Sequence, residues 1–231
     1  MISSINRGIH EIYRNRVPWV WQQRIDLLRG ESQLFLPCMK EAGCIFIHVP
    51  KAAGTSISHS LYGRNVGHRK AKFYHQVSKR EFRKYFSFGF VRNPWDRALS
   101  AYRFVMQGGT AIVKPQAHRR YNSEAFSSFE KFVTAWLGEV ELNHRVDAVF
   151  LPQCDFLMDQ DGNQLVDFVG KIESMEDGIR VVESRLGRAL EVPKLNASRE
   201  KSDYREYYSG ETMDIVARVY QRDIELFDYS F

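Results

Sequence analysis

Two apolar segments of strand length, each ending abruptly at a cation and a proline, constrain the fold of this 231-residue chain. The first, residues 44–49, leads to Lys51, and the second, residues 86–91, leads to Arg92. A stretch that can begin a helix follows each one. A strand, a tight turn and a helix N-terminus direct several main-chain N–H groups at one point, which makes an anion site. Two such sites predict one ligand that carries two separate phosphate-type groups.

Strands alternate with helices along the chain, which indicates a parallel sheet with helices on both faces. We therefore predict a three-layer α/β fold. Asn93 and Ser174 are expected to cap the helices that follow them. Shorter strands are expected at 146–151 and 164–169, and helices at 55–62, from 94 to the glycines at 108 and 109, and at 129–137, 175–186 and 211–227.

The length predicts one domain over residues 1–231, because a chain of this size buries enough surface to fold without metals or disulfides. Residues 1–40 read as an amphipathic arm that packs on the domain, with membrane-surface contact as the alternative. No apolar run approaches the ~18 residues of a membrane span, and the first 30 residues lack a signal-peptide core. Whether the chain forms an oligomer stays open.

The charge of the chain, +5 with an isoelectric point near 9.1, indicates an anionic partner. A bisphosphorylated nucleotide and an acidic glycan fit this charge as well as nucleic acid does. Because the chain has no basic repeat, zinc finger or RNA-binding aromatic pattern, we do not expect nucleic acid. The three cysteines show neither Cys-x-x-Cys nor histidine spacing, which argues against zinc and for a reducing compartment.

The residues around the two cations resemble a known family. Residues 50–56 read Pro-Lys-Ala-Ala-Gly-Thr-Ser, and residues 92–102 read Arg-Asn-Pro-Trp-Asp-Arg-Ala-Leu-Ser-Ala-Tyr. In this order they resemble the donor-binding motifs of sulfotransferase family 2, the carbohydrate sulfotransferases that use 3′-phosphoadenosine 5′-phosphosulfate. Weaker likeness in later segments extends the resemblance over residues 44–231. It implies a P-loop-like sulfotransferase fold.

The resemblance also implies which residues bind the donor. The 5′-phosphosulfate would be held by the loop of Lys51, Ala52, Ala53, Gly54, Thr55 and Ser56. Arg92 and Ser100 would hold the 3′-phosphate, although a structural ion pair with Asp96 is the alternative for Arg92. Asn196, Ser198 and Lys201, in the loop before the last helix, would close over the nucleotide. The product would be adenosine 3′,5′-bisphosphate.

Two residues are predicted to be catalytic. Lys51 would stabilise the negative charge that develops on the leaving oxygen, so no metal is required. His75 lies between the two donor motifs, where related glycan sulfotransferases place a base, and an imidazole of pKa ~6.5 accepts protons near neutrality. Glu173 is the runner-up for the base.

The acceptor is predicted to contact His75, Gln153 and the basic residues Arg119 and Arg120. Arg97 is expected to pair within the protein, and Asp223 to be a buried structural acceptor. The resemblance thus implies sulfuryl transfer to a hydroxyl of a carbohydrate, and an anionic carbohydrate is one candidate. We expect a cytoplasmic, bacterial enzyme rather than a trimmed Golgi-lumenal domain.

Two other function classes stay open. One is a magnesium-dependent nucleotide kinase, although the lysine here precedes the only glycine of the loop, unlike in the nucleotide triphosphate loop. The other is a non-catalytic module that binds a glycan or a nucleotide.

Overall fold

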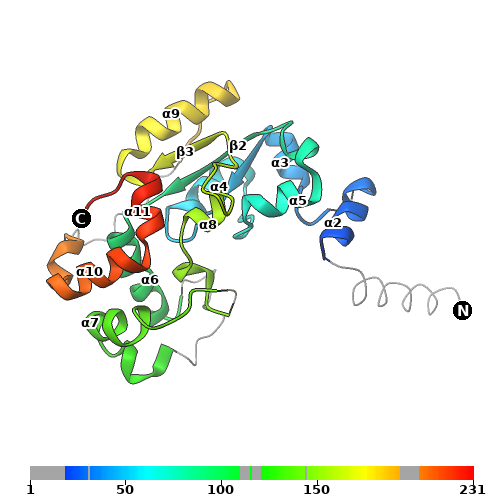
Figure 1. Cartoon of the computed structure of the whole chain (residues 1–231). Coiled ribbons are helices and arrows are strands. Elements are labelled where there is room, and N and C mark those ends of the chain that lie inside the picture. The colour runs from blue at the N-terminus through cyan, green and yellow to red at the C-terminus, as the bar shows by residue number, and fades with distance from the viewer. Residues whose placement is uncertain (1–18, 31, 110–114, 116–120, 144, 193–202) are drawn as a thin grey trace, which may run out of the picture.

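A parallel three-stranded sheet forms the centre of the computed structural model, which describes residues 19–30, 32–109, 115, 121–143, 145–192 and 203–231. The strands are β1 (Cys44–Ile47), β2 (Phe86–Val91) and β3 (Phe168–Lys171), in that order across the sheet (Figure 1). Phe46 lies opposite Phe88, and Phe88 lies opposite Phe168. The predicted α/β class, with a parallel sheet flanked by helices, is confirmed.

Helices cover both faces of the sheet, because successive side chains of a strand point to opposite sides. On one face, Phe46, Phe88 and Phe90 pack with α4 (Gly54–Tyr62) and α9 (Met175–Leu186). On the other face, Ile45, Ile47 and Val91 pack in a cluster to which α3 (Pro37–Ala42), α5 (Ala71–Phe82) and α8 (Cys154–Leu157) contribute.

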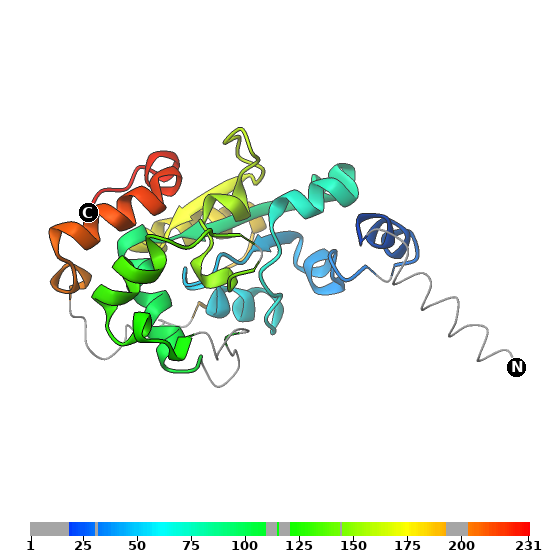
Figure 2. The ribbon, with the colours of Figure 1, turned by 60° about the horizontal axis from the view of Figure 1, so that its bottom comes forward.

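A third apolar cluster lies beside the sheet and takes no residue from its strands. It joins α6 (Pro94–Met106), α7 (Phe129–Lys131) and α10 (Gly210–Val219), with α11 (Gln221–Phe227) following α10. Aromatic rings fill it, among them Phe126, Phe132 and Phe150, which are fully buried. The second view shows this cluster at one end of the molecule and α2 (Trp19–Leu28) toward the other (Figure 2).

The part of the predicted N-terminal arm that the structure describes packs on α5. The Arg24 side chain of α2 donates hydrogen bonds to the main-chain oxygens of Gln76, at 2.7 Å, and Val77, at 3.1 Å. Residues 1–18 of the arm lie outside the described residues. Over the described residues, no helix combines the length and the apolar character that crossing a membrane requires.

The predicted strand at 146–151 is wrong. This segment forms a short 3-10 helix, Ala148–Phe150, because side chains rather than a neighbouring strand bind its carbonyl oxygens. Arg97 donates to Val149 and Leu151, each at 3.0 Å, and Tyr220 donates to Phe150 at 2.9 Å. Apolar periodicity alone does not distinguish such a buried segment from a strand.

Smaller corrections concern the ends and the type of other elements. The strand expected at 164–169 begins only at Phe168, and Gln164 instead forms an isolated antiparallel bridge with Met158. Residues 132–137 are π-helical. The last helix is broken at Tyr220, and the side chain of Ser174 makes no capping bond. The helix at 94–106 and the strand at 86–91 agree with the prediction.

Candidate functional site

The loop after β1 adopts a backbone that non-glycine residues rarely accept. Lys51 has φ 65° and Ala53 has φ 60°, both in the left-handed region. Such positions cost about 1–3 kcal/mol each and persist mainly at functional sites. Left-handed residues turn consecutive N–H groups toward one side, and α4 adds its N-terminus from Gly54 onward. The predicted anion loop therefore has the backbone of an anion-binding nest.

A glycine is required where this loop enters α4. A Cβ atom on Gly54 would lie 1.9 Å from Cδ2 and 2.4 Å from Nε2 of the His48 ring. His48 follows β1 and is only 3% exposed, so its ring has no room to move away. The next two residues, Thr55 and Ser56, keep their side chains at the surface, Thr55 exposed and Ser56 half-buried.

The Lys51 side chain is a half-buried cation. Its Nζ lies 4.7 Å from the centre of the Phe104 ring, and no described carboxylate pairs with it. Loss of hydration, together with the nearby positive charge of Arg92, lowers the Lys51 pKa to about 8. An anion bound here would relieve both effects, since an opposite charge favours the ammonium form.

Arg92 follows β2 and is fixed on two sides. Its Nε and Nη2 donate to the two carboxylate oxygens of Asp96, at 2.8 and 2.7 Å. The ion pair of Arg92 with Asp96, which the sequence offered as an alternative, therefore forms. Its Nη1 donates to the main-chain oxygen of Lys51 at 3.4 Å. A guanidinium has five N–H groups. Asp96 therefore occupies one edge and leaves N–H groups on Nη1 and Nη2 for an anion.

Ser100 lies on the same face of α6 as two residues that contact the loops. Asp96, Ser100 and Phe104 are spaced by four residues, which places them one above another on a helix. Asp96 binds Arg92, and Phe104 contacts the Lys51 amine. Ser100 therefore lies between a residue that binds Arg92 and a residue that contacts Lys51, on the helix face turned toward both loops.

The N-terminus of α6 is held by a carboxylate. Asn93 caps the helix as predicted, its side-chain oxygen accepting from the Trp95 N–H at 3.1 Å. The Asn93 N–H donates to one oxygen of Glu173 at 2.6 Å, and the Tyr229 hydroxyl donates to the other at 2.9 Å. Both oxygens of Glu173 thus support the start of α6, which leaves the runner-up base engaged in a structural role.

Gln153 is not placed to contact an acceptor, contrary to the prediction. The side chain is 0% exposed, and both of its ends bind the main chain of Arg92. Oε1 accepts from the Arg92 N–H at 2.9 Å, and Nε2 donates to the Arg92 carbonyl oxygen at 2.8 Å. Its own N–H donates to buried Asp223, which confirms that Asp223 is a structural acceptor. Gln153 therefore positions Arg92.

His75 lies far along the sheet from Lys51, which argues against its predicted role as base. α5 runs back toward the start of β2, and the His75 ring contacts Phe82 and the main chain of Leu165. Leu165 precedes β3, whereas Lys51 follows β1, so the two lie toward opposite ends of parallel strands. The Nε2 atom of His75 is buried without a partner among the described residues.

Two other histidines lie beside the Lys51 loop, and no sequence motif assigned either of them to the site. Nδ1 of His68 lies 2.9 Å from the main-chain oxygen of His48, and the centres of the two rings are 4.2 Å apart. Burial, followed by the charge of His68, lowers the pKa of His48 to about 3. Because residues 49–67, which include α4, separate the two histidines, no sequence periodicity pointed to this pair.

Several predicted site residues lie outside the described residues, namely Asn196, Ser198, Lys201, Arg119 and Arg120. Among the residues that the structure does describe, no group of three His, Cys, Asp or Glu side chains could hold a metal ion. Arg97 bonds within the protein, as expected, through Val149 and Leu151.

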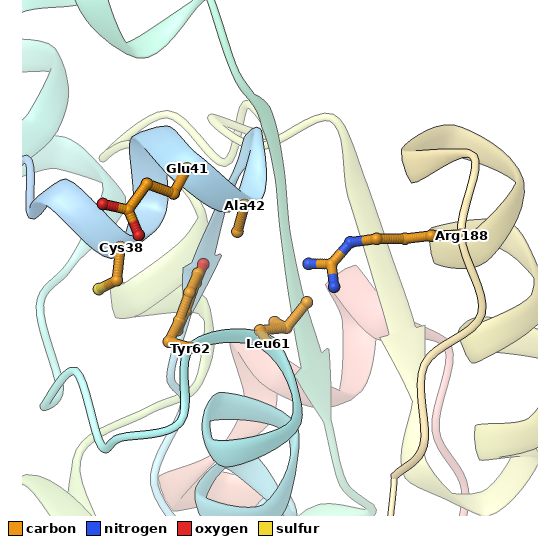
Figure 3. A pocket seen from close by; sticks show the side chains of 6 residues that line it. All are labelled: Cys38, Glu41, Ala42, Leu61, Tyr62 and Arg188. Carbon is orange, nitrogen blue, oxygen red and sulfur yellow. The ribbon is translucent and has the colours of Figure 1, made fainter.

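A pocket of about 380 Å³ lies at the other end of the sheet, and it is not part of this site (Figure 3). It is bordered by α3, the end of α4 and Arg188, two residues after the end of α9. Its lining comprises Cys38, Glu41, Ala42, Leu61, Tyr62 and Arg188. The Tyr62 hydroxyl is already used, since it accepts from the Phe46 N–H and donates to the Cys44 carbonyl oxygen.

Comparison with known proteins gives one positive result. The model of a family described as a sulfotransferase family matches residues 39–230. No curated protein and no solved structure gives a significant match. The matched span covers both loops, the helix with Ser100 and the segment that contains His68.

Proposed function

Because the chain belongs to the sulfotransferase family, we propose that it transfers a sulfuryl group from 3′-phosphoadenosine 5′-phosphosulfate to a hydroxyl of a carbohydrate. The donor would be a substrate of the reaction, and the two loops that follow β1 and β2 would bind it. The proposal rests on the geometry of these loops and on the charge that they concentrate.

One observation carries the proposal: the two cation loops touch each other. The hydrogen bond from Arg92 Nη1 to the Lys51 oxygen places the guanidinium beside the strained loop. Burial, followed by the positive charge of Arg92, lowers the pKa of Lys51, and of the two cations only Arg92 has a carboxylate partner among the described residues. A ligand with two anionic groups on one nucleoside satisfies both loops, which a single phosphate does not.

Each loop would bind one of the two anionic groups of the donor. Lys51, Thr55, Ser56 and the N–H groups at the start of α4 would bind the phosphosulfate. The free N–H groups of Arg92 and the hydroxyl of Ser100 would bind the 3′-phosphate, since a guanidinium matches phosphate geometry. Gln153 would hold the main chain of Arg92 in place, and Asp96 would hold its side chain.

The transfer forms a bond between the acceptor oxygen and sulfur and breaks the bond between sulfur and the bridging oxygen. The bridging oxygen leaves with the electron pair as part of adenosine 3′,5′-bisphosphate. Lys51 would stabilise this charge as it develops, which is the kind of interaction that accelerates the chemical step. The acceptor hydroxyl must lose its proton to a base as its oxygen forms the new bond to sulfur.

The carbohydrate acceptor is proposed to be anionic, or extended along a basic surface. The chain has 33 Lys and Arg residues against 28 Asp and Glu residues, and the segment with Arg119 and Arg120 adds local positive charge. A positively charged cleft attracts an acidic glycan.

The test is a transfer assay with ³⁵S-labelled donor and a panel of acidic and neutral glycans. The proposal expects label on at least one glycan, and release of adenosine 3′,5′-bisphosphate in equal amount. Binding of the bisphosphate without transfer to any glycan, lipid-linked sugar or alcohol would indicate a binding module. Magnesium-dependent phosphate transfer from ATP would indicate a kinase.

A further inference from the structure

A break in α5 determines where α2 lies. Ser78 interrupts this helix with φ −160° and ψ 96°, values outside the helical region. Arg24 of α2 donates to the main-chain oxygens of Gln76 and Val77, the two residues before the break. These bonds hold α2 beside α5, at the end of the molecule that lies away from α10 (Figure 2).

One face of α2 is apolar and exposed. Trp21 is 56% exposed and Leu28 is 89% exposed. Seven residues separate them, which is about two helical turns, so both side chains lie on one face. Val20 and Leu27 of the same helix pack against the core instead. The Arg24 guanidinium lies 4.9 Å from the centre of the Trp21 ring, so a cation borders the exposed face.

The positive charge of the chain is concentrated in the same region. Residues 19–30 and 71–84 contain seven Lys or Arg residues against two Asp or Glu residues. This excess of five equals the +5 of the whole chain. Lys79, Arg80 and Arg83 are exposed beyond the break in α5, and no described carboxylate pairs with any of them. The region therefore combines positive charge with exposed apolar side chains.

We propose that this region binds the surface of a membrane that contains anionic lipids. The binding surface, called here the α2–α5 face, comprises Trp21, Leu28, Lys79, Arg80 and Arg83. The apolar side chains of an amphipathic helix enter the boundary between headgroups and acyl chains, a boundary that tryptophan prefers, and cations attract anionic headgroups. A soluble polyanion such as an acidic glycan would use the cations alone, so the exposed apolar pair favours a lipid surface. The proposal does not depend on sulfuryl transfer.

The two cation loops lie at the opposite edge of the sheet from the α2–α5 face. Residues 79–84 precede β2, whereas Arg92 follows β2 and Lys51 follows β1. A protein bound to a membrane through the α2–α5 face would keep both loops accessible. Lipid phosphates would compete for the cation loops only if the membrane met that other edge, and a soluble bisphosphate distinguishes the two cases.

Sedimentation with lipid vesicles tests the proposal on the full chain. The protein should sediment with vesicles of phosphatidylglycerol and phosphatidylcholine in equal parts, and at least ~10-fold more weakly with phosphatidylcholine alone. Saturating adenosine 3′,5′-bisphosphate should leave the binding unchanged. Absence of sedimentation, equal binding to both kinds of vesicle, or release by the bisphosphate would overturn the proposal.

Two apolar variants test the contact with the acyl boundary. Trp21→Ser combined with Leu28→Ser should weaken binding to the anionic vesicles at least ~10-fold, because the apolar area that enters the bilayer is lost. Val181→Ser is the matched control, since Val181 is 40% exposed on α9. Unchanged binding of the double variant would mean that charge alone attracts the protein, and would overturn the proposal.

Two triple variants of equal charge test the cations. A Lys or Arg near an anionic surface strengthens binding on the order of fivefold. Binding should therefore fall at least ~10-fold when the α5 cations are replaced together, by Lys79→Gln, Arg80→Gln and Arg83→Gln. The control removes the same charge from exposed arginines of α9 and the turn after it, by Arg180→Gln, Arg185→Gln and Arg188→Gln. An equal loss in both triple variants would overturn the proposal.

Fluorescence of the wild-type protein gives an answer even if a variant fails to fold. Brominated lipids in the anionic vesicles should quench the emission that the single substitution Trp21→Phe removes. Absence of this quenching would overturn the proposal. Dimers in solution that depend on Trp21 and Leu28, without vesicle binding, would also overturn it and assign the face to a second copy of the chain.

Discussion

Arg92 donates from Nη1 to the main-chain oxygen of Lys51 across 3.4 Å, which joins the loop after β2 to the loop after β1. The contact exists because the two strands are neighbours in a parallel sheet, so their carboxyl ends lie side by side. It places two cations at one edge, where burial first and the positive charge of Arg92 second lower the pKa of Lys51.

Replacing Arg92 by alanine should weaken adenosine 3′,5′-bisphosphate binding by about 10-fold or more, because a charged partner of the 3′-phosphate is lost. Binding of adenosine 5′-monophosphate, already weaker, should change little. Calorimetry measures both. Arg180→Ala is the control, since Arg180 is an exposed residue of α9. Equal wild-type binding of the two nucleotides would contradict the 3′-phosphate assignment.

Binding of the bisphosphate should take up a proton between pH 8 and pH 9. In the free enzyme the Lys51 pKa is about 8, so a part of the Lys51 side chains is neutral between pH 8 and pH 9. A bound anion raises this pKa again, so those side chains take up a proton. Affinity should accordingly fall as the pH rises above about 8. Calorimetry in buffers of different ionisation enthalpy measures the uptake. Lys51→Arg should abolish it, because arginine stays charged, and an unchanged uptake in this variant would assign the proton elsewhere.

Gly54→Ala should destabilise the protein by about 1–3 kcal/mol and disturb the anion loop, because its Cβ would overlap the buried His48 ring. Gly210→Ala is the matched control. Gly210 also begins a helix, has no positive φ, and has no atom within 4 Å of an added Cβ. Thermal unfolding measures both variants. Equal Tm values for the two would mean that the His48 ring moves aside.

Gln153→Ala should lower the stability and weaken bisphosphate binding together, since the N–H and C=O of Arg92 both lose a partner in a buried place. An unsatisfied buried group costs about 1–3 kcal/mol. The KM for the acceptor should change by no more than the KM for the donor changes. A raised acceptor KM with unchanged Tm and bisphosphate affinity would restore the original assignment of Gln153 to the acceptor.

The elements around the two loops could be predicted from the sequence because their signals are local. The strand 86–91, the Asn93 cap and the helix after Pro94 each depend on residues within a few positions. The segment 146–151 could not be predicted, because its carbonyl oxygens bind Arg97 and Tyr220, which lie about 50 and 70 residues away in the chain.

The sequence by itself determined the fold class and the two cation loops of this protein, since Lys51, Gly54, Arg92 and Ser100 occur in contiguous motifs whose chemistry acts over short range. The tertiary structure alone decided which long-range contacts surround them. It turned Gln153 toward Arg92, engaged Glu173 at the start of α6 and brought His68 rather than His75 beside Lys51. Side-chain neighbours across a sheet edge depend on the packing of distant segments, which no spacing along the chain encodes.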